Sequence, residues 1–217
     1  WLGVNLFFII SGFVILMTLE NTASIGSFVY RRWLRLFPAM LIAILVIYLT
    51  MPFIPERPAG SPGFLSALPG ITFIEPGWWV RAIGVDIPIL EDAFWSLYVE
   101  FKFYVIAAIL FYFLGRKILI SSLIFFYLLS LASQFWVSGI DSQWAHYYSM
   151  LVYELSFEYF GWFAAGALFY LHVTTGQWRP FWAGTFIAFV SACFVRGINL
   201  EVAVYAVLVS AFFITAL

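Results

Sequence analysis

The chain carries very little charge. Of its 217 residues only 10% are Asp, Glu, Lys or Arg, whereas soluble domains average about 25%. Hydrophobic residues make up 65% of the sequence and aromatic residues 22%. No soluble domain of this length has such a composition, so we expect a membrane protein that crosses the bilayer several times. The net charge of −1 indicates no partner.

Residues that build metal and nucleophile sites are also scarce. Cys193 is the single cysteine, which excludes an intrachain disulfide. The two histidines, His146 and His172, show no metal-ligand spacing, and we expect no metal site. The sequence contains no phosphate-binding glycine loop and no nucleophile elbow. The chain opens on Trp1 and closes inside an apolar run, so we interpret it as an internal piece of a longer protein.

Long apolar runs predict an all-α, polytopic bundle of transmembrane helices. A bilayer core of about 30 Å needs about 20 apolar residues as a helix. Seven runs qualify or come close: 2–19, 34–52, 94–114, 118–137, 154–172, 181–196 and 200–217. We expect one domain over 1–217. Its long connection, 53–93, is rich in proline and glycine, so it cannot form a continuous helix. That connection is predicted to be an extracytoplasmic or re-entrant loop.

The basic residues predict the orientation of the bundle. Six of them fall in connections on one side, at positions 31, 32, 35, 116, 117 and 179, and four fall at or near the other side, at 57, 81, 102 and 196. Most acidic residues belong to the second side. We therefore expect residues 31–35 at the cytoplasmic face, and the loop 53–93 and Glu100 toward the outside.

Glu100 is the most informative single residue, because a carboxylate inside an apolar run is costly and is a functional candidate by default. Ser96, Glu100 and Tyr104 lie four residues apart and share one helical face. Lys102 points elsewhere, so Glu100 needs a partner on another helix, a substrate hydroxyl or water. Trp95 lies at the predicted membrane interface. A purely structural hydrogen bond explains Glu100 about as well as a functional role.

Two further pairs could carry chemistry. Arg32 and Arg35 are three residues apart, and arginines bind phosphate through bidentate hydrogen bonds; a basic topology anchor that binds anionic lipid is the alternative. Glu154 and Glu158 are predicted to share a helical face near the outer end of their span. They could act as an acid–base pair, or Glu154 could be solvated while Glu158 bonds a neighbouring helix.

Three blocks of this sequence resemble the membrane-bound acyltransferase 3 family. Residues 3–13, Gly-Val-Asn-Leu-Phe-Phe-Ile-Ile-Ser-Gly-Phe, resemble its second-helix block, in which Asp is more usual than Asn5. Residues 31–38, Arg-Arg-Trp-Leu-Arg-Leu-Phe-Pro, resemble its basic start of the third helix. Residues 95–104 resemble its Trp-Ser/Thr-Leu-x-x-Glu block. The blocks occur in the family's order, and the remainder matches in hydropathy alone.

The resemblance implies a ten-helix core, in a bacterial-type inner or plasma membrane, that moves an acyl group, usually acetyl, from cytoplasmic acyl-CoA to a hydroxyl of an extracytoplasmic or lipid-linked glycan. It implies no bound cofactor, with acetyl-CoA as donor substrate and membrane lipids, but no nucleic acid, as further partners. The family's catalytic Arg and His would precede Trp1, so this piece alone is expected to be inactive. Glu100 would support catalysis, and Arg32 and Arg35 would hold the donor phosphates.

Trp95, Tyr104 and Glu158 would bind the acceptor in that scheme. Two other functions remain open. A non-catalytic membrane module would lack the upstream Arg and His. A transporter with a proton path through Glu100 and Glu158 would show broken helices and internal repeats, and the sequence shows neither.

Overall fold

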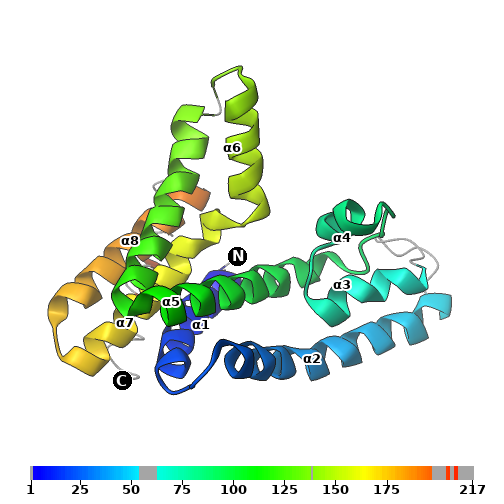
Figure 1. Ribbon diagram of the computed structural model, residues 1–217, viewed down its shortest axis with the longest axis horizontal. Helices are drawn as coiled ribbons and strands as arrows, with labels where there is room; N and C mark the ends of the chain where they lie inside the picture. The colour runs from blue at the N-terminus through cyan, green and yellow to red at the C-terminus, as the bar shows by residue number, and fades with distance from the viewer. Residues whose placement is uncertain (1, 54–62, 138, 197–203, 206–207, 210–217) are drawn as a thin grey trace. The chain divides into compact units, whose positions relative to one another are not determined.

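The protein is built from α-helices, and no strand occurs in the part that the computed structural model describes, which is residues 2–53, 63–137, 139–196, 204–205 and 208–209 (Figure 1). This confirms the predicted all-α class. The helices are α1 (Leu2–Glu20), α2 (Ile25–Thr50), α3 (Ala67–Thr72), α4 (Pro76–Ile83), α5 (Trp95–Ala132), α6 (Gln143–Glu154), α7 (Phe160–Thr175) and α8 (Trp178–Arg196).

Four described helical stretches are long and apolar enough to cross a membrane: Gly3–Glu20, Ile25–Phe53, Asp92–Val137 and Trp178–Val195. The third is 46 residues long, more than twice the length of about 20 residues that one crossing needs. It is broken at Gly115, which adopts φ 85° and ψ 171° inside α5. A positive φ of this kind favours glycine, and the break falls between the predicted runs 94–114 and 118–137.

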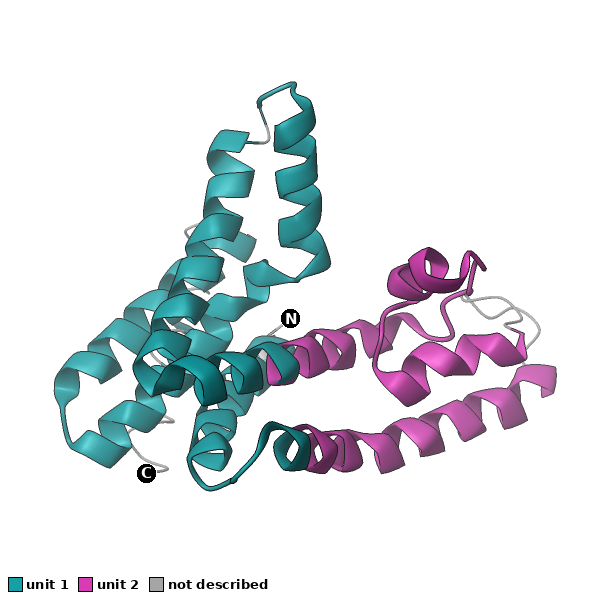
Figure 2. Ribbon diagram, viewed as in Figure 1, with its two compact units in different colours: residues 1–28, 105–217 teal, residues 29–104 magenta. Residues whose placement is uncertain are grey.

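The chain forms two compact units, coloured separately in Figure 2. Unit 1 contains residues 1–28 and 105–217, and unit 2 contains residues 29–104. Helix α5 therefore contributes its first ten residues to unit 2 and the rest to unit 1. Each unit has its own core.

Small residues hold α1 against α7 in unit 1. A Cβ added to Gly166 would overlap the backbone oxygen of Ile9, and one added to Gly12 would overlap the backbone oxygen of Phe163. Such close backbone approach is the usual role of glycine between membrane helices. Every residue of α7 from Phe160 to Tyr170 is buried. Gly12 and Gly166 therefore allow the backbones of α1 and α7 to lie in direct contact.

In unit 2, the proline-rich connection folds back onto the helices on either side of it in sequence. Its helix α3 packs on α2, because Gly70 lies against Met40 and Ile44. The indole nitrogen of Trp33 donates a hydrogen bond to the backbone oxygen of Ile71, at 3.1 Å. As predicted, no continuous helix forms: α3 and α4 are short, and α3 ends at Phe73, which has φ 58°.

Several helix boundaries differ from the prediction. Helix α2 begins at Ile25 rather than at residue 34, and Pro38 lies inside it. Helix α6 was not expected, because its sequence is too polar for a span. The predicted run 154–172 is shorter as a helix, since α7 begins at Phe160. Most of the run 200–217 lies outside the described residues.

Candidate functional site

Glu100 lies in α5 with none of its surface exposed. One helical turn later, the hydroxyl of Tyr104 donates a short hydrogen bond to Glu100 Oε1. Tyr104 is also fully buried. The predicted helical face is therefore real, and Tyr104 serves as the nearest partner of the carboxylate.

Arg32 reaches the same pair of residues from α2. Its guanidinium carbon lies 5.7 Å from the centre of the Tyr104 ring, within the range of a cation–π contact. The Arg32 side chain is also hydrogen-bonded to Tyr104 and interacts electrostatically with Glu100. With only 6% of its surface exposed, Arg32 brings a buried positive charge beside a buried carboxylate. We call Arg32, Tyr104 and Glu100 the buried charge cluster.

The cluster corrects one prediction. Arg32 was expected at the cytoplasmic face and Glu100 toward the outer face, whereas the structure brings the two side chains together. The physical reason is the early start of α2 at Ile25. Seven residues of helix precede Arg32 and carry it about 10 Å along the axis, at 1.5 Å per residue. The free-energy cost of burying the Arg32 guanidinium is lowered because Tyr104 and Glu100 interact favourably with its charge.

The side chains on either side of Glu100 in the sequence contact the proline-rich connection. Lys102, which was predicted to point away from Glu100, forms an ion pair with Glu75 at 2.9 Å. Phe101 packs on Phe73, with ring centres 5.5 Å apart. These contacts fix the proline-rich connection onto the first turns of α5.

The other predicted site residues of unit 2 are more open. Arg35 is exposed on α2, so Arg32 and Arg35 do not present one shared fork despite their spacing of three residues. Trp95 begins α5 and is 40% exposed. Arg35 and Trp95 are accessible to a ligand, whereas Arg32, Tyr104 and Glu100 are enclosed.

Glu158 belongs to unit 1, in the 3₁₀ turn η5 (Phe157–Tyr159). The predicted helical pairing of Glu154 with Glu158 is wrong. Helix α6 ends at Glu154, and Ser156 adopts a left-handed φ of 57°. The backbone leaves the right-handed helical conformation between the two carboxylates, so they do not share a helical face.

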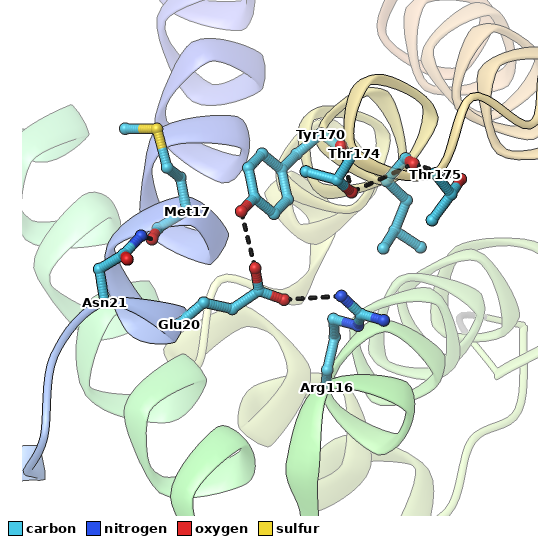
Figure 3. A network of polar contacts seen from close by, with 8 residues as sticks. Met17, Glu20, Asn21, Arg116, Tyr170, Thr174 and Thr175 are labelled. Atoms are coloured by element: carbon cyan, nitrogen blue, oxygen red, sulfur yellow. Dashed lines mark hydrogen bonds and ion pairs between the residues drawn. The ribbon is translucent and has the colours of Figure 1, made fainter.

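Sequence analysis missed a polar network at the end of α1 (Figure 3). Arg116 forms an ion pair with Glu20 Oε1 at 2.8 Å, and the Tyr170 hydroxyl donates a hydrogen bond to Glu20 Oε2 at 2.7 Å. Tyr112 also donates to the backbone oxygen of Thr22 at 2.6 Å. A signal was present, because Glu20 and Arg116 both end predicted spans on the same membrane side and carry opposite charges.

The histidines take no part in these sites. His146 is exposed on α6, and His172 lies 2.9 Å from the backbone oxygen of Gln177 and packs on Trp178. Within the described ranges no group of three or more His, Cys, Asp or Glu side chains could hold a metal ion.

Comparison with known proteins gives one match. The family model Acyl_transf_3, described as an acyltransferase domain, matches residues 2–217. No curated protein and no solved structure matches the chain.

Proposed function

We propose a function from the family, because the chain belongs to the acyltransferase 3 family and forms a multi-pass membrane acyltransferase domain. The proposed reaction transfers an acyl group, acetyl in the first instance, from cytoplasmic acyl-CoA to a hydroxyl group. That hydroxyl belongs to an extracytoplasmic polysaccharide, lipopolysaccharide or related glycan. The observation that carries the proposal is the buried charge cluster. Buried ionisable residues in membrane helices are typical of substrate and proton pathways.

The reaction needs a proton acceptor and a stabilised leaving group. The acceptor oxygen forms an ester bond to the acyl carbon while the thioester C–S bond breaks. The hydroxyl proton passes to a general base, and the sulfur leaves as the CoA thiolate, which takes up a proton. The family resemblance implies a histidine of the family's first helix as this base. Our proposal concerns what the described residues add to that step.

Glu100 is proposed as a positioning residue for the base and the acceptor hydroxyl. A carboxylate that orients an imidazole also stabilises the imidazolium that forms in the reaction. Tyr104 holds Glu100 Oε1, and Arg32 holds the Tyr104 ring. The geometry of the carboxylate is thus fixed before substrate binds, which is the condition for electrostatic preorganisation.

Arg35 is proposed to contact the donor phosphates, because it is the exposed member of the arginine pair and a guanidinium suits phosphate oxygens. Because Arg32 is buried, it would not touch the donor and would influence it only by positioning Tyr104 and Glu100. Trp95, exposed at the start of α5, is proposed to stack on the acceptor glycan. Because Trp33 is hydrogen-bonded to Ile71, this scheme takes the connection 53–93 as a re-entrant segment that reaches from the outer side toward residues 31–35.

The test uses the full-length protein in proteoliposomes, with labelled acetyl-CoA outside and a panel of glycan acceptors inside. We expect label on the enclosed glycan. Arg35→Ala should raise the KM for acetyl-CoA, with Arg31→Ala, exposed on the same helix, as the matched control. Absence of transfer to every acceptor would overturn the proposed activity.

Glu100→Gln should lower kcat by about 10²-fold or more, in line with the loss of general acid–base assistance, and should change the pH–rate profile. Glu100→Asp should recover part of the rate. A Glu100→Gln protein with the wild-type rate and pH profile but lower thermal stability would show that Glu100 is structural only.

A further inference from the structure

Unit 1 contains a polar cavity that the buried charge cluster does not use. Its volume is about 240 Å³. All but one of its lining residues carry a hydroxyl, amide or carboxylate group; these are Ser130, Ser133, Gln134, Ser149, Tyr153 and Glu158, and Val152 is the apolar member. A concentration of polar side chains around one cavity is unusual in a chain that is 65% hydrophobic. The wall therefore combines polar groups with apolar surface.

The walls of the cavity are held firmly. Helix α5 ends in the π-helix η4 (Ser133–Val137), a widened turn that often marks functional sites. Helix α6 lies beside this end of α5 (Figure 1). The Ser133 hydroxyl donates to Ser149 Oγ at 3.1 Å, and the Tyr148 hydroxyl donates to the backbone oxygen of Leu129 at 2.7 Å. The π-helix and α6 thus form a preformed site rather than a gap between loose helices.

Glu158 places a negative charge on the cavity wall. The left-handed turn at Ser156 and the 3₁₀ turn that follows bring Glu158 to this position. In the part of the chain that the structure describes, Glu158 forms no hydrogen bond or ion pair, and no Lys, Arg or His lines the cavity. A half-buried carboxylate without a cationic neighbour requires hydrogen-bond donors from a ligand or from water.

The chemistry of the lining selects the class of ligand. Anions are excluded, because the wall carries a carboxylate and no cation. One carboxylate is a poor cage for Ca²⁺, which takes 6–8 oxygen ligands, usually from several carboxylates and carbonyls. Ser130 and Ser133 donate their hydroxyl protons within the protein, to Tyr127 and Ser149, so their oxygens are left as acceptors. With the Gln134 amide and the Glu158 carboxylate, these oxygens suit the hydroxyl donors of a neutral polyol. Tyr153, 73% exposed, offers its ring as a stacking surface.

We propose that this cavity binds a single sugar ring of the acceptor glycan, with Glu158 accepting hydrogen bonds from adjacent ring hydroxyls and Tyr153 stacking on the ring face. The volume supports one ring rather than an oligosaccharide, since it lies below the range of about 300–1,000 Å³ typical of sites for drug-sized ligands. The assignment of this sugar to the acceptor rests on the proposed function, whereas the sugar site itself does not.

The first experiment measures binding of free monosaccharides to the full-length protein in nanodiscs, by saturation-transfer NMR and calorimetry. The probes are glucose, galactose, mannose and N-acetylglucosamine, with Ca²⁺ as a separate arm. Glu158→Gln should weaken binding of the preferred sugar about tenfold or more, because hydrogen bonds to a charged group are lost. Glu154→Gln, at the end of α6 and outside the cavity lining, is the matched control and should bind as wild type.

Tyr153→Ala provides a second variant that leaves the fold intact, because the side chain is largely exposed. It should also weaken sugar binding. The proposal is overturned if none of the four sugars binds, if Glu158→Gln and Tyr153→Ala bind like wild type, or if Ca²⁺ binds in a Glu158-dependent way and sugars do not.

Acyl-transfer kinetics separate this proposal from the proposed function. With an acceptor that contains the preferred sugar, Glu158→Gln should raise the acceptor KM about tenfold and leave kcat and the KM for acetyl-CoA unchanged. Sugar binding without any acyl transfer would refute the acyltransferase activity and leave the sugar site standing. If acyl transfer occurs and Glu158→Gln leaves the acceptor KM unaltered, the acyltransferase activity stands and the assignment of this cavity to the acceptor sugar is refuted.

Discussion

Arg32→Met tests whether the buried charge cluster holds α2 against α5. Methionine keeps the length and apolar stem of the side chain but removes the charge and the contact with the Tyr104 ring. Arg32 and Glu100 are 6% and 0% exposed, so the carboxylate would remain buried beside Tyr104 without its cation. Breaking a buried charge pair by removing one partner costs about 3–5 kcal/mol.

The assay is thermal unfolding of the full-length protein in nanodiscs. For a domain of this size, 1 kcal/mol shifts Tm by about 2–4 °C, so Arg32→Met should lower Tm by about 6–20 °C. Arg35→Met is the matched control, because it removes the same charge one helical turn later from an exposed position. Its effect should stay within about 0.5 kcal/mol, or about 2 °C.

A double mutant completes this test. Arg32→Met combined with Glu100→Gln removes both charges, and the loss should be smaller than the sum of the single losses by about 0.5–3 kcal/mol, as for residues that interact directly. Two results would refute the reasoning: a Tm for Arg32→Met that matches Arg35→Met, or strict additivity in the double mutant.

Three further predictions concern packing and hydrogen bonding. Gly166→Ala should prevent accumulation of folded protein, because its Cβ would overlap the backbone oxygen of Ile9; Gly3→Ala, with open space around it, should express like wild type on fluorescence size-exclusion. Glu20→Gln should lower the free energy of unfolding by about 1–2 kcal/mol, which is less than the loss from breaking a fully buried ion pair, because the Glu20–Arg116 pair is partly exposed. A Tm unchanged by Glu20→Gln would contradict a stabilising role for this network. Tyr104→Phe should keep the ring contact with the guanidinium but lose the hydrogen bond to the carboxylate, lowering kcat while shifting Tm by less than Arg32→Met does.

Hydropathy and helix-breaking residues predict most of the fold. The apolar runs locate α1, α8 and both halves of α5, because crossing a bilayer requires length and apolarity that few other segments have. Gly115 lies between two of the predicted runs, and the prolines of 53–93 interrupt that connection as expected. Composition failed at α6, whose exposed aromatic and polar residues neither span a membrane nor mark a turn.

The candidate site was predictable in its residues but not in its geometry. The spacing of Glu100 and Tyr104 by four residues is a local property of a helix, and it could be read from the sequence. The meeting of Arg32 with that pair depends on where α2 begins, and hydropathy places that start too late because residues 25–33 are too polar to resemble a span. The sequence pattern predicts an interfacial arginine at this position, because the partner that allows Arg32 to be buried lies on another helix.

The same limit applies to Glu158, whose place on the wall of the cavity could not be derived from the sequence. Spacing of four residues predicted a shared helical face with Glu154, yet the left-handed Ser156 breaks the helix between them. A positive φ at serine is uncommon, and no local signal announces it. Phe157, the next residue, packs on Phe126 with stacked rings 4.4 Å apart. The backbone conformation at Ser156, which spacing alone does not reveal, therefore decides that the two carboxylates do not share a helical face.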